Sequence, residues 1–491
     1  MKKFFQLFLW LLVLLLIIIV VKTLLFRSWQ MQTSGVTVPV GDEVIAHLSE
    51  AVSIPTVSYA IDSPVDSSAF RSYMDFIRRT YPLVHEKFSL EVFNNFTMLF
   101  TWKGADTSLK PMVLMAHYDV VPAGDTSLWE RKPFSGFFDG TYIWGRGTLD
   151  DKASMISILE ALEKLIKEGF KPERTLYLSF GHDEELSGEK GAGAISKTFK
   201  ERGIKPEFVL DEGMAVTSGM IPMMKKPVAL IGTSEKGYLT LKLTVNMPGG
   251  HSSTPEKESA LIVLNKALND LLRKQMKPML SRPVNDFIRY IGPELPFYAK
   301  AIFANKWIFK GILLNIYTGS ASGNALVRTT MAPTIINAGI KDNVIPTKAE
   351  AIVNFRILPG ETSSEVIAWV RKVIGDERVI LEPDKATISE PTPVSSSDSD
   401  GFSFISTTLR QIYPDAVVSP TLMIGSSDSR HFSLVTENIY RFAPIYVTSE
   451  DMARIHGLNE RTRAADFKKG IGFYYQLIGN SQGRIQDKRQ K

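Results

Sequence analysis

The chain has no cysteine among its 491 residues. This absence excludes disulfide bridges, thiolate metal sites and a cysteine nucleophile, and it fits either a cytoplasmic or an exported protein. A strong charge imbalance is also lacking: the formal net charge is +5 and no basic-aromatic pattern accompanies it, so nucleic acid is not expected as a partner. Low-complexity tracts and internal repeats are missing too. A chain of this length is expected to form more than one domain.

One long hydrophobic run is present, at the N-terminus. Two lysines precede an apolar stretch over residues 4–21, which is long enough to cross most of a bilayer. No small-residue cleavage site follows, so an uncleaved membrane anchor over residues 1–27 is favoured over a signal peptide or a buried core helix. The N-terminal lysines favour an anchored body on the exported (periplasmic, extracytoplasmic or lumenal) side, although Lys22 and Arg27 carry similar charge on the other flank.

In the rest of the chain the pattern of predicted helices and strands changes twice. A polar linker over residues 28–40 leads into a region, 41–236, in which helical patterns alternate with short apolar strands; this alternation predicts an α/β domain with a largely parallel sheet. Cleanly alternating strands then predict an α+β domain inserted over residues 237–360. Helix-strand alternation returns over residues 361–480, and a polar tail, 481–491, is expected to be disordered.

Individual elements follow from the same patterns. The expected strands are 93–101, 112–116, 175–180, 208–210, 239–245, 349–357 and 438–442, and the expected helices are 153–168, 363–374, 401–413 and 464–478.

Three of these strands end abruptly in acidic or imidazole side chains. The run that finishes at Ala116 is followed by His117 and Asp119, and the next strand runs into a His-Asp-Glu-Glu sequence that contains Glu184 and Glu185. A third apolar strand ends in Asp211. Because ligands gather beyond the carboxyl ends of strands in open α/β sheets, these side chains are expected to meet.

Two further segments join this set. Asp150 lies in a turn before a helix, where a simple capping role is an equal alternative, and His456 lies far downstream in the sequence ARIHGLNER. Each segment alone has an ordinary explanation, because strand ends are commonly polar and a lone histidine is more often not a ligand. Together, imidazole and carboxylate groups without thiolates predict a catalytic divalent-metal site, with zinc or a similar ion.

The chain resembles the M20 family of dinuclear zinc peptidases and aminoacylases. It most resembles the branch that contains carboxypeptidase S and the N-fatty-acyl-amino-acid synthase/hydrolases. The matching segments include MAHYDVVPAGD, IWGRGTLDDK, GHDEELSG, LDEG, GGHSSTP, SSDSRHF and HGLNE, in the family's order. The resemblance implies a three-layer α/β catalytic domain with a mostly parallel central sheet. It also implies an inserted α+β lid and dimerisation domain, through which a homodimer is expected.

The resemblance also implies residue roles. His117 and Asp211 would hold one zinc, Glu185 and His456 the other, and Asp150 would bridge the two; Co²⁺ or Mn²⁺ would be substitutes in vitro. Asp119 would orient His117, and the Asp150–Asp151 peptide would be cis. Glu184 would be the general base that takes a proton from the metal-bridging water and passes it to the leaving amine.

Three residues of the inserted domain match family positions as well. His251, in the sequence MPGGHSSTP, would stabilise the tetrahedral oxyanion, often in the partner subunit's active site. Asn343 would bind the scissile carbonyl, and Arg356 would bind a free carboxylate of the substrate. From spacing alone, His251 is an ordinary loop histidine and Arg356 a charged strand end.

The expected activity is therefore hydrolysis of an amide bond next to a free amino-acid carboxylate, either a C-terminal peptide bond or an N-acyl amino acid. The alternatives are an aminopeptidase of related dinuclear zinc chemistry and a non-catalytic scaffold on the same fold. The segment 296–317 is unusually apolar. A core or dimer-interface helix is favoured there over a long-chain acyl pocket or a surface that leans on a membrane.

Overall fold

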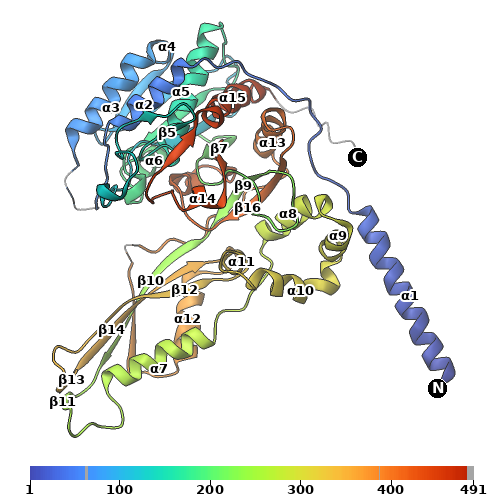
Figure 1. The fold of residues 1–491 in the computed structure, drawn as a ribbon, viewed down its shortest axis with the longest axis vertical. Helices are drawn as coiled ribbons and strands as arrows, with labels where there is room; N and C mark the ends of the chain where they lie inside the picture. The colour runs from blue at the N-terminus through green and yellow to red at the C-terminus, as the bar shows by residue number, and fades with distance from the viewer. Residues whose placement is uncertain (61–62, 64, 386, 484–491) are drawn as a thin grey trace. The chain divides into compact units, whose positions relative to one another are not determined.

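The computed structural model describes residues 1–60, 63, 65–385 and 387–483 (Figure 1). The chain forms two compact units. The large unit consists of Leu25–Thr233, Arg289–Lys300 and Ser395–Lys491, and the small unit consists of Met1–Leu24, Ser234–Ile288 and Ala301–Val394. Most of the expected tail, residues 484–491, lies outside the described part of the chain.

The large unit contains a ten-stranded sheet among the described residues. Its order is β1-β2-β6-β3-β7-β17-β9-β8-β18, and β16 also pairs with β9. Its strands are β1 (Ser89–Phe93), β2 (Thr97–Trp102), β3 (Met112–His117), β6 (Leu176–Gly181), β7 (Phe208–Asp211), β8 (Val216–Thr217), β9 (Val228–Glu235), β16 (Val417–Met423), β17 (Ile439–Arg441) and β18 (Tyr446–Val447). Its helices are α2 (Glu43–Ser53), α3 (Ser67–Thr80), α4 (Pro82–Lys87), α5 (Lys152–Lys167), α6 (Ala192–Glu201), α13 (Asp400–Ile412), α14 (Ser449–Met452) and α15 (Ala464–Asn480). A small separate sheet joins β4 (Phe137–Phe138), β5 (Tyr142–Trp144) and β19 (Arg461–Arg463).

The central sheet is mixed, whereas the sequence predicted a mostly parallel one. The four strands β6, β3, β7 and β17 are parallel neighbours. The β1–β2 and β2–β6 pairs on one side, and the β17–β9 and β9–β8 pairs on the other, are antiparallel. The antiparallel strands β2 and β9 carry buried apolar runs like those of the parallel strands, so a buried run alone does not reveal strand direction.

Side chains from the sheet pack into two separate cores, one on each face. Strand β3 is buried along its whole length, as expected for a strand covered on both sides. Met112 and Leu114 belong to the core that includes α2, α3, α5, α13 and α15, and Figure 1 shows α5 and α15 side by side. Val113 and Met115 point the other way, against Ile195 and the rest of α6. The large unit therefore has three layers.

The small unit is built on the antiparallel sheet β12-β14-β10-β15. Strands β10 and β14 alternate between buried and half-buried residues, as their sequence predicted, because one face is covered by α7 and α12. The unit continues past the expected end at residue 360, since β15 pairs with β10. Its strands are β10 (Gly237–Asn246), β11 (Gly250–His251), β12 (Thr330–Ala338), β13 (Val344–Ile345), β14 (Lys348–Ile357) and β15 (Val379–Pro383). Its helices are α1 (Lys2–Leu25), α7 (Ala260–Arg273), α8 (Arg282–Ile291), α9 (Phe297–Ala304), α10 (Lys306–Thr318), α11 (Ala321–Val327) and α12 (Ser363–Ile374); the residues of α1, α8 and α9 are divided between the two units.

Two segments differ from their sequence-based interpretation. The expected linker is attached to the large unit, because the Gln30 amide exchanges two hydrogen bonds with the backbone of Val418, of 3.0 and 2.7 Å. Helix α10, in the apolar segment 296–317, is not a core helix. Leu313 is its one buried residue in the described part of the chain, while Trp307 and Ile312 are about half exposed.

Candidate metal centre

The candidate site lies at the carboxyl ends of the parallel strands in the large unit. His117 ends β3 and pairs with Gly181, the last residue of β6. Asp211 ends β7, which pairs with β3 on its other side. Because neighbouring parallel strands end at one edge of a sheet, the three chain segments that follow them start from the same place. The arrangement expected from the sequence is present for these strands.

Four of the expected ligands form one cluster. Ligand atoms of His117, Asp150 and Glu185 all lie within 4.8 Å of one another. His117 Nε2 is 2.9 Å from Asp150 Oδ1, and His456 Nε2 is 3.0 Å from Asp150 Oδ2. His456 Nε2 is also 3.4 Å from Glu185 Oε2. The two carboxylate oxygens of Asp150 thus face different histidines, which is the arrangement that a bridging carboxylate requires. The peptide bond from Asp150 to Asp151 is cis.

Asp119 contacts both His117 and the loop that carries Glu184 and Glu185. Its backbone carbonyl is 3.0 Å from His117 Nδ1, closer than its own Oδ1 at 3.5 Å, so the nearer contact to the imidazole is the main chain and not the carboxylate. The carboxylate accepts hydrogen bonds from the amides of Glu184 and Glu185, each of 3.2 Å. The buried Asp119 carboxylate therefore ties the end of β3 to the loop after β6.

Burial and contacts between the acids and the two histidines dominate the electrostatics of the site. Burial raises the pKa of the Glu184 carboxyl well above its ordinary value, against the attraction of His117, and burial also raises the pKa of Asp211. Burial acts on Asp150 in the same direction, but hydrogen bonds from His117 and His456 hold its pKa below the ordinary value. The same contacts with Asp150 and Glu185 raise the pKa of His456 to about 10.

These residues fit a divalent metal of the zinc type. The donor set consists of imidazole nitrogens and carboxylate oxygens, which are the ligands of catalytic zinc sites in proteins without thiolates. The buried Oε1 atom of Glu185 has no hydrogen-bond partner in the described structure. Glu212, next to Asp211, adds another carboxyl whose pKa burial raises well above its ordinary value. A cation would supply the positive charge that this group of buried acids lacks.

Two buried residues that sequence reasoning did not single out organise the site. Arg146 Nη1 and Glu460 Oε2 form a 2.6 Å ion pair. Arg146 Nη2 also donates to the carbonyl of His456 at 3.2 Å, and Glu460 Oε1 accepts from the amides of Gly147 and Leu149 at 3.0 and 2.8 Å. The pair lies within the segments IWGRGTLDDK and HGLNE, but nothing in the spacing of one sequence shows that the two charges meet.

The segment SSDSRHF contributes a second support. The amide of Ser429 donates to Asp211 Oδ2 at 2.8 Å and so fixes this carboxylate. Asp428 is buried beside it, and burial together with the charge of Asp211 raises the pKa of Asp428 well above its ordinary value. The sequence signal was the segment itself, which the family resemblance includes, but no role had been assigned to its acid.

The expected oxyanion-stabilising His251 and the expected substrate-binding Asn343 and Arg356 belong to the small unit. His251, on β11, is exposed and pairs with Val344, and the backbone carbonyl of Asn343 accepts a 3.2 Å bond from Ser252. Arg356 lies at the other end of β14, with its guanidinium 4.6 Å from the centre of the Tyr238 ring. His251 and Asn343 are therefore close to each other, and Arg356 is not with them.

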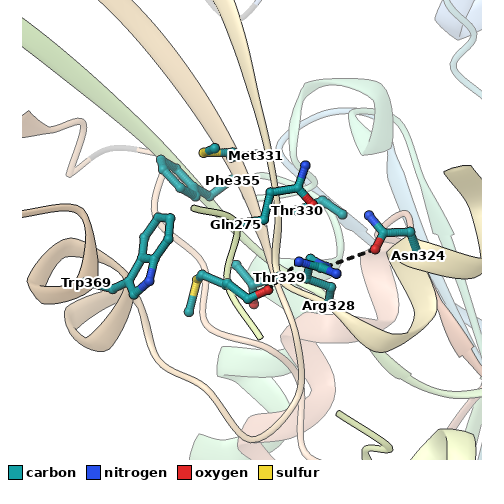
Figure 2. Close-up of a pocket in the computed structure, with 9 residues that line it drawn as sticks. Gln275, Asn324, Arg328, Thr329, Thr330, Met331, Phe355 and Trp369 are labelled. Atoms are coloured by element: carbon teal, nitrogen blue, oxygen red, sulfur yellow. Dashed lines mark hydrogen bonds between the residues drawn. The ribbon is translucent and has the colours of Figure 1, made fainter. Parts of the chain in front are cut away.

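A small cavity of about 50 Å³ also lies in the small unit (Figure 2). It is lined by Trp369, Phe355 and Arg328, among others, and Arg328 donates hydrogen bonds to Asn324 Oδ1 and to the carbonyl of Met276. The apolar segment 296–317 contributes no residue to it. This cavity is too small for a long acyl chain, so it is not the acyl pocket that was the less favoured interpretation of that segment.

Comparisons with known proteins agree with this geometry. Residues 113–480 match the peptidase family M20/M25/M40. A probable carboxypeptidase S-like 2 of Dictyostelium discoideum is 41% identical over 444 residues, covering 90% of this chain and 85% of the relative. An N-fatty-acyl-amino acid synthase/hydrolase of Xenopus tropicalis is 42% identical over 462 residues, covering 93% and 90%. The crystal structure of an M20 family metallo-carboxypeptidase from Sulfolobus solfataricus superposes with a TM-score of 0.65 at 18% identity, covering 89% of this chain and 99% of that one. The chain belongs to the M20/M25/M40 peptidase family and is an enzyme of that type.

Proposed function

We propose that the enzyme hydrolyses an amide bond next to a free amino-acid carboxylate, in a C-terminal peptide bond or in an N-acyl amino acid. The observation that carries this proposal is the cluster of His117, Asp150, Glu185 and His456, with the Glu184 carboxyl in the same loop. The relatives support both substrate classes, since one is a probable carboxypeptidase and the other acts on N-fatty-acyl amino acids.

In this proposal the cluster and Asp211 together hold two zinc ions. His117 and Asp211 would bind one ion, Glu185 and His456 the other, and Asp150 would bridge them. The bound metal supplies a Lewis acid that polarises the scissile carbonyl and makes water acidic enough to be deprotonated near neutral pH. The positions of the two Asp150 oxygens, each against a different histidine, support the bridging role.

Glu184 is the proposed general base. Its carboxylate would take the proton from the attacking water and hold it at a carboxylate oxygen while the tetrahedral intermediate forms. It would then give this proton to the nitrogen of the leaving amine, so that the C–N bond breaks with a neutral amine as the product. Burial raises the pKa of Glu184 and so makes its carboxylate a stronger proton acceptor, as the first of these two steps requires.

The free carboxylate of the substrate would be bound by Arg356. A guanidinium offers two parallel N–H donors to a carboxylate, and the Arg356 guanidinium lies over the Tyr238 ring, 4.6 Å from its centre, in a cation–π contact. His251 would stabilise the oxyanion, and Asn343 would bind the scissile carbonyl.

The separation of these residues supports a homodimer through the small unit. Arg356 lies eight residues beyond Lys348 on β14, which corresponds to about 27 Å along a strand, whereas His251 and Asn343 lie before the start of β14. A substrate the size of an amino-acid derivative does not span this distance. One copy would therefore supply Arg356 to a given substrate, and a second copy would supply His251 and Asn343.

We further propose that α1 anchors the enzyme in a membrane, with the rest of the chain on the exported side. The helix is long and apolar enough to span a bilayer, and none of its apolar window is buried. An uncleaved helix of this kind acts as a signal anchor.

The test uses the full-length chain, purified in detergent and loaded with zinc. Release of free amino acid is followed by mass spectrometry from N-oleoyl-phenylalanine, its carboxyl-amide and an N-blocked dipeptide with a free C-terminus. We expect cleavage of at least one free-carboxylate substrate and none of the carboxyl-amide, and the faster substrate decides between aminoacylase and carboxypeptidase. An unblocked dipeptide amide is added as a fourth substrate. If it alone is cleaved, the enzyme is an aminopeptidase and the proposal is refuted.

A further inference from the structure

Helix α10 exposes an apolar face that no other part of its own unit covers in the described structure. Ile308, Ile312 and Ile316 follow one another at four-residue spacing, so they form one stripe along the helix. Their exposed fractions are 41%, 49% and 55%, and Trp307 at the start of the helix is 53% exposed. A helix whose apolar stripe points outward is typically covered by a partner or a lipid surface.

The beginning of α10 is in direct contact with the end of α1, within the small unit. Asn305, the residue before α10, donates from Nδ2 to the carbonyl of Ile19 at 3.1 Å and to Thr23 Oγ1 at 3.2 Å. Both Asn305 and Thr23 are completely buried by this contact. Lys22 adds a second link, because its Nζ lies 5.1 Å from the centre of the Trp307 ring.

With α1 as the proposed anchor, its length places this contact at a membrane surface. A 24-residue helix is about 36 Å long, whereas the hydrocarbon core of a bilayer is about 30 Å thick. The last turns of α1, which contain Lys22 and Thr23, therefore lie where the helix leaves the hydrocarbon. Trp and Lys side chains are typical of that level, so the start of α10 lies at the depth of the lipid headgroups.

The charge of the segment complements an anionic lipid surface. Between Phe297 and Thr318 the sequence contains three lysines, Lys300, Lys306 and Lys310, and no aspartate or glutamate. Lysines near the membrane are attracted to anionic headgroups. A second copy of the chain offers no such complement, because it would bring the same lysines to the contact.

We propose that α10 is a membrane-docking surface, which lies in the bilayer interface with Ile308, Ile312 and Ile316 turned toward the lipid. The inference rests on the membrane anchor proposed above, but it does not depend on the substrate class. The small unit is then held at the membrane at two places, by the spanning helix α1 and by the adjacent apolar face of α10.

The absence of cysteine makes a direct test possible, because a single introduced cysteine is the only labelling site. Full-length variants Ile312→Cys and Ile316→Cys carry a bimane fluorophore in nanodiscs of phosphatidylcholine with a minor share of phosphatidylglycerol. Two controls are labelled in the same way: Leu12→Cys in the middle of α1, and Ile340→Cys, which is 98% exposed in the turn after β12. Quenching is measured with doxyl groups placed near the head or near the end of the acyl chain, and with aqueous iodide.

We expect the shallow doxyl group to quench the labels on α10, and iodide to quench them only weakly. The loss of fluorescence at α10 should be at least about half of the loss that the deep doxyl group causes at Leu12→Cys. The Ile340→Cys label should show the reverse pattern. Iodide quenching at α10 equal to that of Ile340→Cys would place this face in water and refute the docking surface. Protection from both quenchers would show a protein partner, such as a second copy, and would refute it as well.

The Leu12→Cys variant separates the two proposals. If its label is not quenched by lipid while the α10 labels are, the anchor proposal fails and the docking surface remains. If lipid quenches Leu12→Cys but not the α10 labels, the anchor remains and the docking surface is wrong. If lipid quenches neither, both proposals are wrong.

Discussion

Arg146 and Glu460 form an ion pair with an N–O distance of 2.6 Å in which the side chains are only 2% and 0% exposed. The pair joins two loops that are far apart in the sequence. Glu460 accepts from the amides that lead to Asp150, and Arg146 donates to the carbonyls of His456 and Gly457. The proposed bridging ligand and the last proposed ligand are therefore positioned by the same two buried charges.

The first prediction concerns this ion pair. In Glu460→Gln, the buried Arg146 loses its counter-charge. The amides that lead to Asp150 also lose a charged hydrogen-bond acceptor, which is replaced by a weaker neutral one. We expect zinc affinity to fall by about 10- to 100-fold, as for other changes behind metal ligands, and the thermal midpoint of unfolding to fall with it. Titration with a zinc indicator measures the affinity. The control is Glu450→Gln, an 84% exposed carboxylate on α14, and equal affinity in the two variants would contradict the positioning role.

The second prediction concerns Glu184. In Glu184→Gln the proton carrier is lost, while the proposed ligands His117, Asp150 and Glu185 remain. We expect kcat to fall by about a hundred- to ten-thousand-fold with metal content unchanged, as measured by activity assays and elemental analysis on the same sample. Glu189→Gln, an exposed acid in the same segment, should retain normal activity. Near-normal turnover in Glu184→Gln would show that another group is the base.

Metal removal is the third prediction. Without a cation, the buried carboxylates Asp150, Glu185 and Asp211 repel one another, so the folded state loses stability. We expect treatment with a chelator to lower the thermal midpoint, and zinc at about 100 times its dissociation constant to restore about 2.7 kcal/mol of folding free energy. Magnesium should restore less, because it prefers all-oxygen octahedral sites. A midpoint that does not change with the chelator would argue against a resident metal.

The fourth prediction concerns substrate recognition by Arg356. Hydrogen bonds to a charged group contribute about 1.5–3 kcal/mol, so Arg356→Ala should lower kcat/KM for a free-carboxylate substrate by about 10- to 100-fold. Arg356→Lys should recover part of this loss, since a lysine keeps the charge but not the paired donors. Arg371→Ala, an exposed position on α12, is the matched control. An unchanged kcat/KM in Arg356→Ala would transfer the role to another cation.

The fifth prediction is a pH dependence of stability from Lys236. Its Nζ is buried and donates to the carbonyls of Ala325 and Arg328 at 3.0 and 2.8 Å. Burial, followed by the charge of Arg356, lowers the pKa of Lys236 to about 7 from an ordinary value of 10.5. Between these two values the unfolded chain binds more protons at this residue than the folded chain does. The contribution of Lys236 to stability therefore rises with pH in this window.

Denaturant unfolding of the full-length chain at several pH values from about 7 to 10 checks this sign. The free energy of unfolding of wild type relative to Lys236→Met should increase with pH, by up to about 1.4 kcal/mol per pH unit. A difference that stays constant, or that falls with rising pH, would show that Lys236 keeps an ordinary pKa in the folded chain.

Much of the site could be read from the sequence because strand ends carry a strong signal. The apolar runs before His117 and Asp211 predicted strands that the structure contains as β3 and β7. Neighbouring parallel strands end at the same edge of the sheet, so the reactive side chains that follow one strand lie next to those that follow another. The alternation in β10 and β14 was also sufficient to predict two half-buried antiparallel strands.

Other features depend on contacts that one sequence does not record. The antiparallel strands β2 and β9 carry buried apolar runs as the parallel centre does, so strand direction could not be predicted from these runs. Arg146 and Glu460 are separated by 314 residues, and neither position has a local pattern that indicates a buried charge. The attachment of Gln30 to Val418 is equally non-local, and a polar sequence alone indicated a free linker.

Strand β17 has a consequence for the order in which the enzyme is made. It lies between β7 and β9 in the large sheet, and Asn438 just before it binds the carbonyl of Glu207, 231 residues earlier. While a ribosome is still synthesising the small unit, β7 has no neighbour on that side. The large sheet closes only after almost the whole chain has been translated, and His456 emerges after β17. Metal loading of the complete set of proposed ligands would therefore be a late event, which a nascent or truncated chain cannot reach.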